Sequence, residues 1–259
     1  MEARLVDMHC HLDRIADAPA VASDAARLGI AILDTTVAPR EALLARRTLG
    51  SCDTVRVGVG LHPWWLSDGS CTDSDVDLLV ELVSSSAFVG EVGLDFSRRH
   101  EHARERQLEA FCRMAETVAE RHLPHRVLSI HAVRSAGAAL DVLERYSLAG
   151  KAAPPGLSCI FHWFSGTSDE LARARRAGCF FSVNEHMLAT RRGREYARII
   201  PEDRLLLETD APPQLDAPWN AQDLEASLAR TLDAVAAIRN VDSHDLGAHI
   251  AQTSLSLLC

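Results

Sequence analysis

The chain has 259 residues, of which 47% are apolar and 24% charged, and its formal net charge at pH 7 is −9. This balance is typical of a globular protein with enough apolar material for a core, and about 250 residues suit one α/β barrel. The acidic charge argues against a protein that coats nucleic acid by bulk electrostatics. It does not exclude an enzyme that holds a single phosphate locally.

Neither a membrane span nor a signal region is predicted. No run of 18 or more apolar residues occurs, and the N-terminal residues 1–7 lack an apolar signal region. We therefore expect a cytoplasmic protein without a membrane anchor. The seven cysteines are scattered, odd in number and without a CxxC pair, which predicts reduced thiols rather than disulfides or a zinc ribbon.

Short apolar and often β-branched runs predict eight strands that alternate with helices. The strands are expected at Leu5–His9, Ile30–Val37, Val55–Leu61, Phe88–Leu94, Val127–His131, Leu157–His162, Cys179–Val183 and Arg204–Thr209. Helical patterns lie at Glu41–Leu49, Asp73–Val83, Arg104–Arg121, Ser135–Tyr146 and Asp169–Ala177. Strands of nearly continuous hydrophobicity indicate a parallel sheet covered by helices, and eight such units favour a TIM-type (β/α)8 barrel.

The chain after the eighth strand predicts two further helices. Three prolines within residues 212–218 mark an irregular loop. A helix with one apolar face follows over about 224–238, and a last helix covers about Ser243–Leu258. No long linker, repeat or low-complexity tract interrupts the chain, so residues 1–259 are expected to form one domain. No glycine-rich phosphate loop follows any strand, which excludes the usual nucleotide-binding folds.

Histidines and carboxylates gather where the predicted strands end, which is where barrel enzymes carry their sites. The first strand ends in His9-Cys10-His11, and side chains two positions apart in a strand face the same side, so both histidines can bind one ion. The fourth, fifth, sixth and eighth strands end near Glu91, His131, His162 and Asp210. Each of these residues alone is as consistent with ordinary packing as with a metal site. Together they predict a site for a pair of zinc, manganese or magnesium ions.

Five segments resemble the TatD family of metal-dependent deoxyribonucleases. They are Asp7-Met8-His9-Cys10-His11-Leu12-Asp13, Gly60-Leu61-His62-Pro63, Gly90-Glu91-Val92-Gly93-Leu94-Asp95, Phe161-His162-Trp163-Phe164-Ser165-Gly166 and Glu208-Thr209-Asp210-Ala211-Pro212. The resemblance covers about residues 1–215. It implies a metallo-dependent hydrolase barrel with two or three divalent ions that hydrolyses DNA, typically from a 3′ end. The metal ligands that it implies are His9, His11, Glu91, His131, His162 and Asp210.

A narrower likeness concerns three segments after the fourth strand. Ser129-Ile130-His131, His162-Trp163-Phe164-Ser165-Gly166 and Phe181-Ser182-Val183-Asn184 with Met187-Leu188 resemble the TatD-type nuclease component of Qat anti-phage systems. Those systems also encode an ATPase, a QueC-like protein and a further component. This likeness implies antiviral defence with these proteins as partners.

Three departures from the TatD pattern lie where substrate would bind. Trp64 stands where many family members have a second histidine, and the arginine after His131 comes at position 134, one residue later than usual. The loop over 211–216 lacks the family's arginine. None of these departures removes an implied ligand.

We expect His9, His11 and Asp210 to hold one ion, His131 and His162 to hold the second, and Glu91 to bridge them. Asp210 and Glu91 are the predicted catalytic residues, with Asp210 as general base because a carboxylate can accept the proton of an attacking water.

Other side chains near the strand ends are expected to contact the substrate. They are His62, Arg98, Arg134 and Trp163. Asp13 and Glu208 are either acceptors that orient ligand histidines or carboxylates that are solvated or paired with an arginine.

Two other functions remain open at this point. The same barrel and metals serve amidohydrolases that act on a small ester, amide or phosphate, although such relatives often carry a carbamylated lysine where this chain has Glu91. A component that docks onto a defence complex and has little activity alone is the second alternative.

Overall fold

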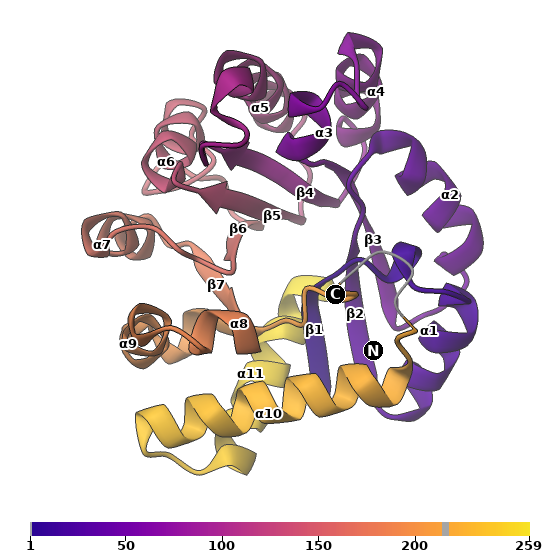
Figure 1. Ribbon diagram of the computed structural model, residues 1–259, viewed down its shortest axis with the longest axis vertical. Coiled ribbons are helices and arrows are strands. Elements are labelled where there is room, and N and C mark those ends of the chain that lie inside the picture. Colours follow the sequence, from indigo (N-terminus) through magenta and orange to yellow (C-terminus); the bar gives the residue numbers. More distant parts are fainter. Residues whose placement is uncertain (1, 214–217) are drawn as a thin grey trace.

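A computed structural model describes residues 2–213 and 218–259. Its centre is a ring of strands surrounded by helices (Figure 1). The strands are β1 (Leu5–Cys10), β2 (Ile30–Thr35), β3 (Val55–Leu61), β4 (Phe88–Asp95), β5 (Arg126–Val133), β6 (Leu157–His162), β7 (Phe180–Val183) and β8 (Leu205–Leu207). Each pairs in parallel with the next strand along the chain, in the order β1 to β8. The predicted TIM-type barrel is confirmed.

The helices alternate with the strands, as the sequence indicated. They are α1 (Ala18–Arg27), α2 (Pro39–Leu49), α3 (Pro63–Ser67), α4 (Asp73–Val83), α5 (Arg104–Glu120), α6 (Ala136–Arg145), α7 (Ser168–Arg176), α8 (Glu185–Leu188), α9 (Arg191–Ile199), α10 (Ala221–Arg239) and α11 (Ser243–Leu258). Within the described part of the chain, no helix is long and apolar enough to cross a membrane.

Four of these helices were not predicted, and three strands, β2, β7 and β8, are shorter than expected. Helix α1 buries mainly alanines, which give a weak apolar pattern; α3 and α8 are short, and α9 lies in the connection from β7 to β8. Strand β8 was expected over Arg204–Thr209. It begins later because Arg204 ends a 3-10 turn, and it ends earlier because Thr209 binds a side chain of β1.

The barrel closes where β8 returns to β1. The backbone N–H of Asp210 donates to the carbonyl oxygen of His9 at 2.9 Å. The buried Asp7 carboxylate accepts from the backbone N–H and the hydroxyl of Thr209, at 3.0 and 2.6 Å. Burial raises the pKa of Asp7 to about 7, although these hydrogen bonds oppose the rise. The closure brings the ends of the first and last strands, with His9 and Asp210, side by side.

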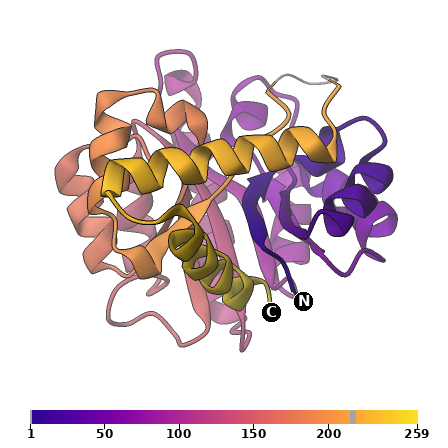
Figure 2. The ribbon, with the colours of Figure 1, turned by 90° about the horizontal axis from the view of Figure 1, so that it is seen from below.

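The inside of the barrel is filled by apolar side chains from strands on all sides. Val6, Met8, Ala31, Leu33, Val127, Ile160, Phe180 and Leu206 form one buried cluster with Leu257 and Leu258 of α11. Side chains of opposite strands can meet only inside the barrel. Helix α11 therefore plugs the end at which the strands begin, beside the N-terminus (Figure 2). The opposite end, where the strands finish, is left for a site.

A buried arginine at the start of β5 ties two helices to the barrel. Arg126 is 1% exposed, and its guanidinium donates to the carbonyl oxygens of Val83 and Ser86, both at 3.0 Å. It also donates to those of Val118 at 3.3 Å and Arg121 at 2.9 Å. Two of these carbonyls lie in the last turns of α4 and α5, where carbonyls lack partners inside their own helices, and two lie just beyond them. One cation thus satisfies both helix ends.

We expect Arg126→Met to lower the free energy of unfolding by about 2–5 kcal/mol, because several buried carbonyls lose their donor together. Urea denaturation measures the change. Arg113→Met on the surface of α5 is the matched control, since its exposed ion pair with Asp77 contributes at most about 1 kcal/mol. A loss for Arg126→Met no larger than that of the control would contradict the assignment.

Candidate metal centre

A cavity of about 680 Å³ opens at the ends of the strands. Six histidines and carboxylates for which a site role was predicted from the strand ends line it together, whereas His9 lies fully buried beside them. The six are His11, His62, Glu91, His131, His162 and Asp210.

Glu91 of β4 lies at the centre of this group and is 1% exposed. Its Oε1 is 2.7 Å from Nδ1 of His131 and 2.9 Å from Nε2 of His162. Nε2 of His62 lies 3.2 Å from the same oxygen. Three imidazoles from three strand ends therefore surround one carboxylate oxygen.

The second oxygen of Glu91 faces a different group. Oε2 lies 3.4 Å from Nε2 of both His9 and His11. Oδ1 of Asp210 lies 3.3 Å from Nε2 of His11 and 3.7 Å from that of His9. Within the described residues, Nε2 of His9 is buried without a hydrogen-bond partner. Two histidines and two carboxylates thus point at one place, a donor set that fits a divalent cation.

Charges in this cluster favour a cation. Burial opposes ionisation of Glu91, but the adjacent His62 and His162 hold its pKa well below the usual range. Burial likewise opposes ionisation of Asp210, yet the hydrogen bond from His11 and the nearby histidines lower its pKa to about 2. Against the effect of burial, Asp210 and Glu91 raise the pKa of His11 to about 9. Carboxylates that hold protons on imidazoles also favour a divalent ion, which releases those protons on binding.

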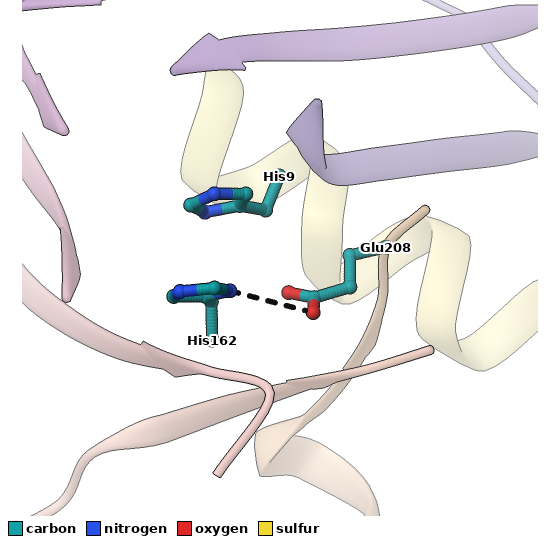
Figure 3. A group of neighbouring side chains, drawn as sticks. All are labelled: His9, His162 and Glu208. Atoms are coloured by element: carbon teal, nitrogen blue, oxygen red, sulfur yellow. Dashed lines mark ion pairs between the residues drawn. The ribbon is translucent and has the colours of Figure 1, made fainter. Parts of the chain in front are cut away.

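Two of the histidines lie flat against each other. The rings of His9 and His162 are 3.9 Å apart between centroids and 11° from parallel, with Glu208 beside them (Figure 3). Burial, followed by the nearness of His162, lowers the pKa of His9 to about 4, so His9 is neutral at pH 7. Neutral imidazole is the form that binds metals.

The ring nitrogens that face away from this cluster have their own partners. Nδ1 of His9 is 2.7 Å from the hydroxyl oxygen of Ser129, and Nδ1 of His11 is 2.5 Å from the carbonyl oxygen of Thr35. Such partners fix the orientation of a ligand histidine.

Of the two carboxylates predicted as possible acceptors, only one faces a histidine in the described residues. Oε1 of Glu208 is 3.6 Å from Nδ1 of His162 and accepts from the Asn184 amide at 2.7 Å. The Asp13 carboxylate has no described hydrogen bond to a histidine: its Oδ1 is buried without a partner, and the backbone N–H of Asp13 donates to the Asp34 carboxylate at 3.1 Å.

Glycines in the motifs let the strands around Glu91 approach closely. A Cβ on Gly60 would lie 1.7 Å from the carbonyl oxygen of Thr36, and one on Gly93 would lie 2.1 Å from that of His131. Gly93 also has φ +142°, a conformation that side-chain-bearing residues rarely adopt. The glycines on either side of the site thus keep the strands that carry Glu91 and His131 in contact.

The predicted substrate residues divide into two groups. His62 and Trp163 line the cavity, whereas Arg98 and Arg134 are exposed and are not among its lining residues. The basic side chain that does line the cavity is Arg14, which sequence reasoning missed although it directly follows the first motif.

Arg14 is held in place by two neighbours. Its Nη2 donates to Glu41 at 2.6 Å, and its guanidinium lies 5.4 Å from the centre of the Trp65 ring.

Asp95 at the end of β4 was also missed as a site residue. Its Oδ2 accepts from the indole N–H of Trp64 at 2.6 Å and lies 3.4 Å from Nε2 of His131. Burial opposes its ionisation, but the hydrogen bonds from His131, Ser97 and Trp64 hold the pKa of Asp95 well below its usual range. Its place at a strand end, next to the other donors, was the available signal.

Comparison with known proteins assigns this site to a family. The profile of the family described as TatD related DNase matches residues 6–258. The chain belongs to the TatD related DNase family. TatD barrels of known structure have the same fold: a TatD family hydrolase of Entamoeba histolytica, 16% identical, and the TatD homologue YJJV of Escherichia coli K12, 20% identical. Each has a TM-score of 0.78 and is matched over 98% of its length and 99% of this chain.

Curated relatives with closer sequences carry the name 3′-5′ ssDNA/RNA exonuclease TatD. The protein of Erwinia tasmaniensis is 32% identical over 201 residues, which are 74% of this chain and 73% of the relative. That of Erwinia billingiae is 31% identical over 237 residues, or 87% and 85% of the two chains. The resemblance to TatD deoxyribonucleases is confirmed, and the chain is a hydrolase of the nuclease type. The narrower likeness to Qat components stays a prediction.

We expect Ser129→Ala to weaken divalent metal binding about 10- to 100-fold, because His9 loses the group that fixes its ring. Calorimetric titration of the metal-free protein with Mn²⁺ or Zn²⁺ measures the dissociation constant. Ser165→Ala is the matched control, since Ser165 lines the same cavity without a described hydrogen bond to a histidine. Equal weakening in the two variants would rule out this role of Ser129.

Proposed function

We propose that this TatD protein is a metal-dependent exonuclease that hydrolyses phosphodiester bonds at the ends of single-stranded DNA. The arrangement around Glu91 carries the proposal, because its two oxygens face two separate groups of donors. The names of the Erwinia relatives support a single-stranded substrate and cleavage from a 3′ end.

The proposed ligands divide between the two oxygens of Glu91. His9, His11 and Asp210 would hold one divalent ion, His131 and His162 a second, and Glu91 would bridge the two. Zinc, manganese and magnesium all suit such mixed donors. Ions bound there would polarise the phosphoryl oxygens and lower the pKa of a bound water toward roughly 7.

Asp210 is the proposed general base. Its carboxylate is ionised at neutral pH, and its side chain is 20% exposed at the cavity wall, so a water molecule can reach it. The water oxygen forms a bond to phosphorus while the bond from phosphorus to the departing nucleoside oxygen breaks. Asp210 takes the proton of the water, and the departing oxygen takes one from solvent. Glu91 is too deeply buried for this role and is proposed to hold the two donor groups together.

Asp210→Asn is expected to lower kcat about 10²- to 10⁴-fold, because the amide cannot accept the proton. Oligonucleotide binding should be largely retained. Release of nucleotides from single-stranded DNA with Mn²⁺ measures turnover. Asp203→Asn, at an exposed carboxylate in the turn before β8, is the control and should leave kcat unchanged. Near-normal turnover of Asp210→Asn would exclude it as the base.

The same assay should include RNA and a panel of small lactones, amides and phosphate esters. Hydrolysis of the small substrates alone would favour the amidohydrolase alternative and would refute the nuclease proposal.

Substrate contacts are proposed for His62 and Trp163 inside the cavity and for Arg98 and Arg134 outside it.

We expect the effects of the arginine-to-glutamine variants on KM to depend on substrate length. Arg14→Gln, at the cavity wall, should raise KM for a dinucleotide and for a ten-residue oligonucleotide alike. Arg98→Gln and Arg134→Gln should raise KM only for the longer strand, since only the longer strand extends beyond the cavity. Effects of Arg98→Gln or Arg134→Gln on the dinucleotide that equal those of Arg14→Gln would contradict this placement.

The partners implied by the Qat likeness form a separate part of the proposal. The nuclease would act in the cytoplasm beside an ATPase and a QueC-like protein in anti-phage defence. Co-purification with that ATPase, and activity seen only in the complex, would support this role. Full activity of the isolated chain and no association with an ATPase encoded beside it would argue against it.

A further inference from the structure

We propose that the cavity recognises unpaired nucleic-acid bases through two tryptophans, Trp64 and Trp163, and that stacking contributes more than cationic side chains to its affinity for a strand. This inference rests on the proposed nuclease function and states how the substrate is held.

Both tryptophans expose large apolar rings at the cavity wall. Trp64 is 43% exposed and Trp163 is 37% exposed. Among the large apolar side chains that are exposed in residues 2–213 and 218–259, these two are the ones that line the cavity. An exposed aromatic ring at a cavity wall is typical of a surface that binds a flat apolar group.

Each ring stacks on a histidine. Trp64 stacks on His100 with centroids 5.4 Å apart and planes 11° from parallel. Trp163 stacks on His186 at 5.2 Å and 19°. Trp64 is held further by the hydrogen bond from its indole N–H to Asp95. Rings fixed in this way lose little conformational freedom when a ligand stacks on them, which favours binding.

The two rings lie on different sides of the donor cluster. Trp64 comes two residues after His62, at the end of β3, and Trp163 directly follows His162, at the end of β6. Strands β4 and β5, which lie between β3 and β6 in the barrel, carry Glu91 and His131. A strand whose phosphate lies over the donor cluster can therefore place neighbouring bases on either ring. Trp163 also has φ +38°, a strained conformation that bulky residues rarely adopt.

Apart from the proposed metal ions, which would bind one phosphate, side-chain charge offers little affinity for a strand. The chain carries a net charge of −9, and the carboxylates of Glu91 and Asp210 line the cavity. Arg14 is the one arginine or lysine among the described lining residues, and it already pairs with Glu41. Proteins that bind strands through many phosphate contacts lose about 10³- to 10⁵-fold in affinity between 50 and 200 mM salt. With so few cationic side chains to contact further phosphates, this cavity is expected to lose less than about tenfold.

The test compares two probes that differ only in their bases. Fluorescence anisotropy gives the dissociation constants of the metal-loaded protein for a six-residue phosphorothioate oligo(dT) and for an abasic strand of the same length. We expect the wild type to prefer oligo(dT). Trp64→Ala and Trp163→Ala should each weaken oligo(dT) binding roughly 5- to 150-fold, as loss of one stacked base predicts. The ratio of the two dissociation constants should fall toward one.

Phenylalanine at either position should retain part of the preference, because it keeps a ring. Leu44→Ala is the control, since Leu44 is exposed on α2 outside the cavity, and its ratio should equal that of the wild type. An unchanged ratio in both alanine variants, or a salt dependence above a thousandfold between 50 and 200 mM, would overturn the proposal. A thermal melt of each variant separates unfolding from loss of stacking, and Trp163→Ala tests the idea independently if Trp64→Ala fails to fold.

The binding measurement requires no turnover, so the stacking proposal can be refuted independently of the nuclease proposal. A wild type that prefers oligo(dT) but hydrolyses no phosphodiester with Mn²⁺, Zn²⁺ or Mg²⁺ would refute the nuclease and support the stacking cavity. A wild type that hydrolyses DNA but binds both probes equally would support the nuclease and refute the stacking proposal.

Discussion

The site depends on one buried carboxylate whose two oxygens face different histidines. A carboxylate as buried as Glu91 is costly unless cations or hydrogen-bond donors compensate its charge. Five imidazoles surround it here, from the ends of β1, β3, β5 and β6, and Nδ1 of His131 lies within hydrogen-bond distance at 2.7 Å. None of them is near Glu91 in the chain, so only the closed barrel brings them together. The requirement to neutralise Glu91 therefore links the fold to the chemistry.

The two ends of the barrel differ in the side chains that they carry. At the end where the strands begin, apolar side chains and the last turn of α11 fill the interior, and Arg126 joins two helices to the wall. At the other end the polar side chains face inward instead. The Asp7–Thr209 contact closes the ring at that end and places Asp210 beside His9. The well-packed apolar end of the barrel thus supports the polar end that carries the site.

Much of this arrangement could be predicted from the sequence, because strands buried on both faces are nearly continuously apolar and the ends of parallel strands meet. That reasoning placed the eight strands and brought His9, Glu91 and Asp210 to one mouth. It could not find α1, whose buried side chains are mostly alanine. Nor could it find the Trp64–Asp95 hydrogen bond. The two residues are 31 positions apart, and the hydrophobic periodicity of a sequence does not indicate which side chains meet.

The same bond indicates how substrate and metal ligands can influence each other. Under the proposed assignment, Trp64 and Trp163 lie beside His62 and His162 in the sequence but are not ligands, so recognition and metal binding would use different residues. In space they are not fully separable. Asp95 Oδ2 accepts from the Trp64 indole and lies 3.4 Å from His131 Nε2, on the ring whose other nitrogen faces Glu91. A base stacked on Trp64, as proposed, would therefore act through Asp95 on His131.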